Sequence, residues 1–209
     1  MSLVWSLTER VRFPGAGGLK TAAMASPEGG VGPAVMLVAP ADPAGGSDLC
    51  SAFARRGFVA ASLVPAGSGQ RELESPDPDD LAGLAGFLFA RRATAGNAVG
   101  VVAFDDGVGA SIALVRSIPD VVRALVLFGP LAAGDLLGLP VPVQAHVQAA
   151  VEADLGDGAG AGVVELVRHQ DLPRPHHLTM GANGSDEGVL TRVVDFLDRW
   201  LRPPSRPPT

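Results

Sequence analysis

The sequence predicts an α/β protein: a three-layer fold with a mostly parallel sheet and helices on both faces. Strand and helix signals alternate after a short N-terminal hairpin, and the later strand segments are apolar on both faces, as buried parallel strands are. The chain has 209 residues, of which 47% are hydrophobic and 18% charged, enough to bury a sizeable core. We expect one domain at residues 1–201 and a Pro-rich tail at 202–209.

The expected strands are short apolar runs bounded by turn residues. Val4–Phe13 alternates, Pro14–Gly18 signals a turn and Leu19–Ala25 returns, which predicts the hairpin. The later strands are expected at Ala34–Ala39, Phe58–Val64, Val99–Ala103, Val122–Phe128, Val141–Val147 and Val163–Val167, with a glycine-rich loop at Gly156–Gly162.

The expected helices carry recognisable start and stop signals. Ser47 is the expected cap of the first helix, and Gly57 ends it. Asp77–Asp80 begins the second with an acidic first turn and a proline at its first helical position. The third is expected at Val108–Ser117, and Ser185 caps a long amphipathic last helix.

The most informative stretch is Ala98–Ala110, where a buried strand turns sharply into a helix. Small residues, Ala103 and Gly107, stand two positions on either side of Asp105. A nucleophile elbow needs such neighbours, because its strained central residue brings two backbones close together. An ordinary elbow carries Ser or Cys at the centre, whereas this one carries Asp105.

Composition excludes several classes of function. The net charge is −6 and the arginines are dispersed, so neither nucleic acid nor a membrane surface is an expected partner. Cys50 is the single cysteine, which leaves no internal disulfide and no cysteine-based metal site. The four histidines show no i, i+4 pair, and Gly107-x-Gly109 lacks the third glycine of a dinucleotide site. We therefore expect no metal and no cofactor; the oligomeric state stays open.

The N-terminus has neither the basic start nor the long apolar run of a signal peptide, which favours a cytoplasmic protein. The chain contains no tyrosine, so mechanisms that need a tyrosine acid are excluded.

From about Ala34 to Leu201 the chain resembles the α/β-hydrolase fold, specifically the small dienelactone-hydrolase type without a cap domain. The resemblance rests on the order of several pieces. These are Val-Met-Leu-Val-Ala-Pro, Arg-Arg-Gly-Phe-Val-Ala-Ala, the elbow, Val-Arg-Ala-Leu-Val-Leu-Phe-Gly-Pro, Val-Pro-Val-Gln-Ala-His-Val, the Pro175-His176-His177 loop and the closing helix.

The resemblance implies where the chemistry lies. The nucleophile position falls on Asp105, and the catalytic histidine on His177 or His176, with His177 preferred. The acid position after Val141–Val147 is nearer Val151 than any carboxylate, which leaves Glu152, with Asp154 and Asp135 as substitutes. Oxyanion donors would be the backbone N–H of Asp106 and those of the Ala39-Pro40-Ala41 loop.

Two departures limit this carry-over: the nucleophile is a carboxylate, and the acid is displaced. Haloalkane dehalogenases and epoxide hydrolases of this fold resemble the arrangement, but the first usually have Trp after the Asp, where this chain has Asp106, and the second usually use Tyr. Asp105 is thus expected to be a nucleophile or a general acid/base acting on a small organic metabolite, by hydrolysis or by proton transfer such as dehydration or cyclisation.

Several of these residues also have a purely structural interpretation. Asp105–Gly107 could be only a turn and helix cap, His146 is expected to be a satisfied core histidine, and His169 is expected at the surface. The alternative function is a catalytically inactive scaffold of this fold that binds a small molecule or a protein partner. A doubly wound, flavodoxin-like binder is the third possibility.

Overall fold

Eight strands form one sheet in the part of the chain that the computed structural model describes: residues 8–38, 43–64, 76–91, 94–148, 163–171 and 185–202. Their order is β1-β2-β4-β3-β5-β6-β7-β8. The pairs from β4 to β8 are parallel, while β1 and β2 join antiparallel, which confirms the predicted α/β class with its N-terminal hairpin. The strands are β1 (Glu9–Gly15), β2 (Gly18–Ala25), β3 (Gly32–Val38), β4 (Val59–Leu63), β5 (Thr94–Phe104), β6 (Val122–Phe128), β7 (Val143–Gln148) and β8 (Val164–His169).

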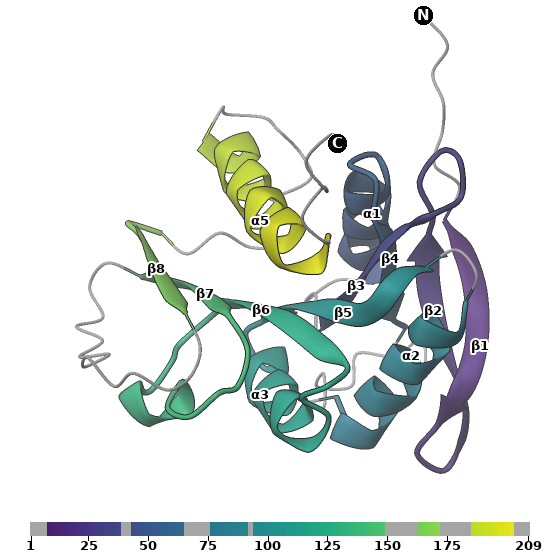
Figure 1. Cartoon of the computed structure of the whole chain (residues 1–209), viewed down its shortest axis with the longest axis horizontal. Coiled ribbons are helices and arrows are strands. Elements are labelled where there is room, and N and C mark those ends of the chain that lie inside the picture. The colour runs from purple at the N-terminus through teal and green to yellow at the C-terminus, as the bar shows by residue number, and fades with distance from the viewer. Residues whose placement is uncertain are drawn as a thin grey trace, which may run out of the picture.

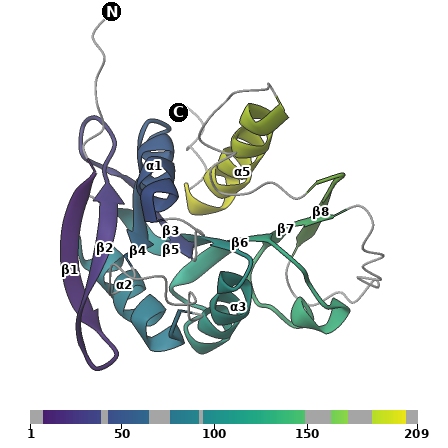
Figure 2. The ribbon, with the colours of Figure 1, turned by 180° about the vertical axis from the view of Figure 1, so that it is seen from behind.

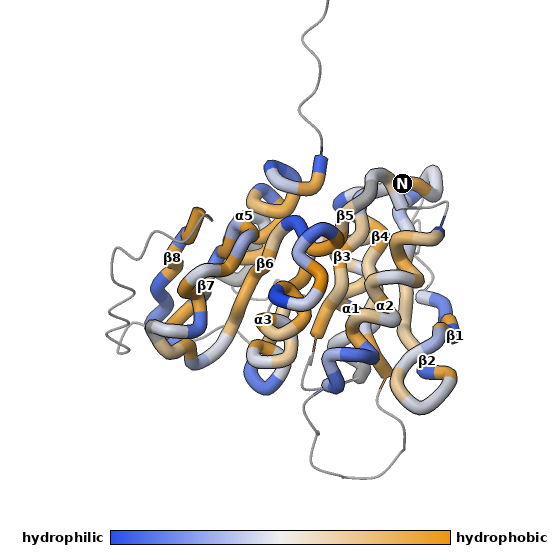
Figure 3. The backbone as a smooth tube through the Cα atoms, turned by 60° about the horizontal axis from the view of Figure 1, so that its bottom comes forward, coloured by the Kyte–Doolittle hydropathy of each residue, from blue (hydrophilic) through white to orange (hydrophobic). Residues whose placement is uncertain are grey.

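Helices cover both faces of this sheet, as Figure 1 shows. On one face lie α2 (Pro78–Ala90) and α3 (Gly107–Ser117), and on the other lie α1 (Pro43–Ala54) and α5 (Ser185–Leu201), an arrangement also seen from behind in Figure 2. Every residue of β3 is buried, and most of the strand is hydrophobic in Figure 3. The sheet therefore has an apolar core on each face. No helix within the described ranges is long and apolar enough to cross a membrane.

The first helix ends where the sequence indicated. The Gly57 N–H donates to the Ala54 carbonyl at 3.0 Å, and the Phe58 N–H donates to the Phe53 carbonyl at 3.1 Å. This is a Schellman motif, and it requires the left-handed φ of +87° that Gly57 adopts. The motif turns the chain directly into β4.

The start of α2 also holds the hairpin in place. Asp77 caps the helix by accepting a hydrogen bond from the Asp79 N–H at 2.9 Å, as predicted. Asp80 is buried, accepts from the Ala16 N–H at 2.7 Å and pairs with Lys20 at 2.8 Å. The turn between β1 and β2 is thereby fixed to the helix.

Three elements begin well away from the residues expected, whereas the other starts lie within two residues of the prediction. The first helix begins at Pro43 rather than being capped by Ser47, because proline tolerates the first turn, where an N–H lacks a helical partner anyway. β1 begins at Glu9, not Val4, and residues 1–7 lie outside the described part. β5 begins at Thr94 rather than Val99. The first part of this strand contains Gly96, with a positive φ of 88°, so it does not show the run of apolar residues by which the strand was predicted.

Candidate functional site

Asp105 occupies a strained turn between the last residue of β5, Phe104, and the first residue of α3, Gly107. Its φ is +42°, and it is the one non-glycine residue with a positive φ among those the structure describes. Its N–H donates to the Phe128 carbonyl at 2.8 Å, which fixes the turn to the end of β6. A left-handed conformation costs about 1 kcal/mol for such a residue and persists because its surroundings enforce it. The predicted backbone geometry of Asp105 is thus confirmed.

Gly129, directly after β6, makes room for this turn. A Cβ atom at position 129 would lie 3.3 Å from both the Cα and the N of Asp105, and 3.4 Å from Cγ2 of Val108. Such distances are tighter than most Cβ contacts, so a side chain here would press on Asp105. The end of β6 therefore helps to set the position of Asp105.

The exposed side of the turn opens onto a groove of about 430 Å³, a size suited to a small molecule. Three acidic residues line it, Asp105, Asp106 and Asp135, together with Arg116. Arg116 donates to the backbone carbonyl of Asp135 at 3.3 Å, and the Asp135 carboxylate accepts from the Ala132 N–H at 2.8 Å. The remaining wall is formed by α3 and the segment after β6: Val108, Gly109, Ile112, Ala113 and Pro130.

The helix-cap alternative for the Asp-Asp-Gly turn applies to Asp106, which occupies the N-cap position of α3. Its side chain makes no cap hydrogen bond to the helix, and its φ and ψ of −64° and −19° are those of a helical residue. Capping therefore does not account for the carboxylate at position 106.

Of the candidate site residues, the structure brings together Asp105, Asp106 and the substitute acid Asp135 in one groove. The others lie outside the described residues and are not placed relative to Asp105: Ala39, Pro40, Ala41, Glu152, Asp154, His176 and His177.

A column of four rings crosses the carboxyl ends of β5 to β8. Phe104 stacks on Phe128 at 5.0 Å between ring centroids, Phe128 on His146 at 4.1 Å, and His146 on His169 at 5.1 Å. The interplanar angles are 12°, 23° and 15°, so the rings lie nearly parallel. His146 is fully buried, which confirms the expected core histidine.

A chain of hydrogen bonds satisfies both ring nitrogens of His146. Nδ1 shares a hydrogen bond of 2.8 Å with Nε2 of His169, and Nε2 shares one of 3.0 Å with Oε1 of Gln144. The Gln144 amide nitrogen donates to Glu165 at 3.3 Å. Burial, and then repulsion by His169 and Arg192, lowers the pKa of His146 to about 3, so this ring is neutral at pH 7.

The expected surface position of His169 was wrong. The residue is half-buried because it bonds His146, and burial followed by the Arg192 charge lowers its pKa. Two polar rings near the ends of consecutive strands were the available signal, but only the pairing of β7 with β8 shows that they meet. Within the described ranges, no three His, Cys, Asp or Glu side chains gather as metal ligands.

No protein-family profile and no curated protein matches this sequence. Solved structures do match in three dimensions. An esterase of Pyrococcus furiosus superposes with a TM-score of 0.71 at 12% identity, covering 93% of each chain. A dienelactone hydrolase of Anabaena variabilis gives 0.69 at 17% identity, covering 95% of this chain and 100% of the other. An α/β serine hydrolase without lid from Xanthomonas campestris gives 0.65 at 14% identity, covering 99% and 100%.

Proposed function

We propose that this chain, which has the α/β-hydrolase fold shared by dienelactone hydrolases and esterases, is an enzyme that acts on a small organic molecule through the carboxylate of Asp105. The observation that carries the proposal is the strained backbone of Asp105, with φ +42° at the β5–α3 turn beside a groove. Glycine would take this conformation without strain. An acidic side chain kept there at an energetic cost is most simply explained by chemistry.

The charge of the groove favours a neutral or cationic substrate. Among the described residues that line the groove, Asp105, Asp106 and Asp135 face one cation, Arg116, so an anionic substrate would be repelled on entering. The same charges would oppose a leaving halide. The chain also has no tyrosine to protonate an epoxide oxygen.

Two roles of Asp105 are consistent with this groove. As a nucleophile, one carboxylate oxygen bonds to an alkyl carbon while the leaving group departs with its electron pair. Water then attacks the carbonyl carbon of the resulting ester, and the acyl C–O bond to the product breaks. The product leaves as an alcohol with one proton of the water, the second proton is released, and the carboxylate is restored. As a general base, the carboxylate takes a proton from carbon or oxygen and later returns it. The acidic surroundings favour the second role, because it requires no anion to leave beside Asp106.

The resemblance to the fold family suggests which other residues would assist Asp105. His177 or His176 would exchange the proton with Asp105, and Glu152 is the weaker candidate for a third member. The backbone N–H of Asp106 and one from the Ala39–Ala41 loop, in which Pro40 has no N–H to donate, would stabilise a developing oxyanion.

The two roles are separated by incubating the protein in D2O with cyclohexanone, γ-butyrolactone, styrene oxide and 4-nitrophenyl acetate. Proton NMR follows loss of C–H signals, and intact-protein mass spectrometry follows adducts. A general base exchanges deuterium into a carbonyl compound, whereas a nucleophile leaves an ester on Asp105. Asp105→Ser tests the third case: it raises 4-nitrophenyl acetate hydrolysis only if Asp105 replaces an ester-cleaving serine. If Asp105→Asn matches the wild type in every reaction, the inactive-scaffold alternative is favoured instead.

A further inference from the structure

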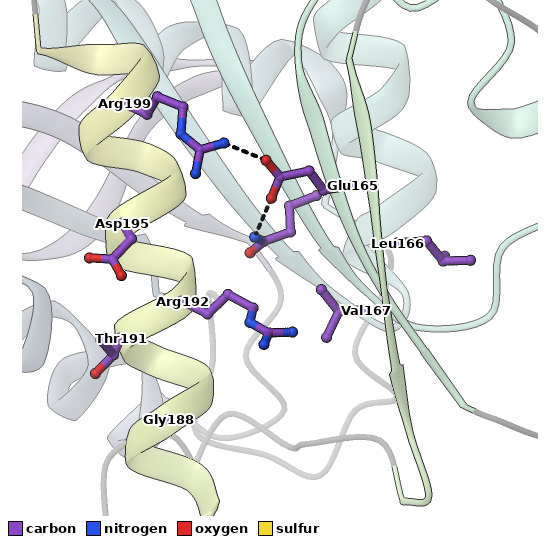
Figure 4. Close-up of a pocket in the computed structure, with 9 residues that line it drawn as sticks. Glu165, Leu166, Val167, Gly188, Thr191, Arg192, Asp195 and Arg199 are labelled. Atoms are coloured by element: carbon purple, nitrogen blue, oxygen red, sulfur yellow. Dashed lines mark hydrogen bonds and ion pairs between the residues drawn. The ribbon is translucent and has the colours of Figure 1, made fainter.

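A second groove of about 430 Å³ lies between β8 and α5, on the face of the sheet opposite α3 (Figure 4). Its lining shares no residue with the groove beside Asp105. Glu165 and Val167 of β8 face Arg192 and Arg199 of α5 across it. The proposed reaction at Asp105 uses none of these residues.

The two arginines in this groove differ in their ion pairing. Arg199 pairs with Glu165 at 2.5 Å. In the part of the chain that the structure describes, no carboxylate lies within ion-pair distance of Arg192. Figure 4 shows Arg192 extending toward Val167, while Asp195 points away from β8. Glu165 and Asp195 also line the groove, so its positive end is the guanidinium of Arg192, which makes no ion pair with the described residues.

The course of α5 brings Arg192 to the end of the groove where His169 lies. Glu165, Val167 and His169 alternate along β8 and so share the face turned to α5. Arg199 and Glu165 form one ion pair between α5 and β8. Arg192 lies about 10 Å before Arg199 along the helix, and His169 lies about 13 Å after Glu165 along the strand. Arg192 extends toward Val167, and His169 is the next residue of β8 on the same face, so both lie at this end of the groove. The Arg192 charge also contributes to the lowered pKa of His169.

The hydrogen-bond chain beneath the groove fixes the tautomer of His169. Because the Gln144 amide nitrogen donates to Glu165, its oxygen is left to accept from Nε2–H of His146. Neutral His146 then has a lone pair on Nδ1, which must accept from Nε2–H of His169. In neutral His169, Nδ1 is therefore the ring nitrogen that keeps a lone pair and can take up a proton.

We propose that Arg192 and His169 form a binding site for the carboxylate or phosphate group of a small molecule. The Arg192 guanidinium supplies a planar pair of donors that fits either group. A proton taken up at Nδ1 of His169 supplies a second charged donor, while Nε2–H stays bonded to His146. The groove has the volume of a small-molecule site.

The test is an NMR titration of the histidine ring nitrogens with inorganic phosphate and, separately, with acetate, at constant ionic strength adjusted with chloride. We expect saturable shifts at His169, and a rise of its pKa by roughly one unit when the site is filled. The anion that saturates at the lower concentration identifies the preferred group. Asp105→Asn should bind in the same way, since the site does not depend on the proposed reaction.

Arg192→Gln removes the cation from the groove and should weaken binding by about tenfold or more. Arg168→Gln is the matched control, because it removes one exposed arginine from the opposite face of the same strand and should leave binding unchanged. His169→Gln keeps a donor for His146 and should abolish proton uptake on binding. Shifts that never saturate with either anion, or equal affinities of the Arg192→Gln and Arg168→Gln proteins, would overturn the proposal.

Discussion

Acid should unfold this protein in part through His146. The native ring is neutral with a pKa of about 3, whereas a histidine in the unfolded chain has a pKa of about 6.5. Below pH 6.5 the unfolded state binds a proton that the native state does not, so the stability that His146 contributes is present above pH 6.5 and lost as the pH falls toward 3. One proton corresponds to about 1.4 kcal/mol per pH unit, which amounts to about 2.7 kcal/mol between pH 8 and pH 4.5.

His146→Phe removes this titrating ring and keeps every other ionisable side chain of the protein. The phenyl ring can continue the stack on Phe128, but it leaves Gln144 and His169 without their shared partner. At pH 8 the variant should be less stable by about 1–3 kcal/mol. Urea unfolding followed by far-UV circular dichroism should show this gap shrink by about 2.7 kcal/mol at pH 4.5. A gap that stays constant with pH would refute the assignment of a neutral, buried His146.

Three further predictions concern backbone positions. Gly83→Ala should destabilise the protein by about 1–3 kcal/mol in urea unfolding, since its Cβ would lie 2.2 Å from the Pro14 carbonyl oxygen. The control is Gly86→Ala on the same helix, whose Cβ would have nothing within 4 Å. It should stabilise the protein by up to about 1 kcal/mol. Asp105→Gly should raise the thermal midpoint slightly, because it relieves the positive φ, while enzymatic turnover is lost. Gly129→Ala should raise the activation free energy for kcat by more than it lowers the free energy of unfolding, because its Cβ presses on Asp105.

The sequence predicts the fold well because its strong signals are local. The run Val122–Phe128 became β6 with the expected bounds, and the cap at Asp77 and the stop at Gly57 came from residues that act within one turn of helix. The start of α1 was misplaced because Ser47 resembles a cap although the helix already begins at Pro43.

The site could be predicted only in part. The small residues flanking Asp105 revealed its strained backbone, since they are a local requirement of the turn. The approach of Gly129 and the contact between His146 and His169 depend on which strands pair, and no single segment encodes that pairing. The roles of His176, His177 and Glu152 remain predictions, because these residues lie outside the described part of the chain.

The central claim is that the carboxylate of Asp105 does the chemistry, and the kcat of Asp105→Asn tests it most directly. This change keeps the size of the side chain and removes its charge. With the substrate found in the exchange and adduct experiments, we expect kcat to fall by about 100-fold or more while the urea midpoint stays near that of the wild type. Asp120→Asn, a change at another exposed aspartate in the turn before β6, should retain full activity. An Asp105→Asn protein as active as the Asp120→Asn control would contradict the claim.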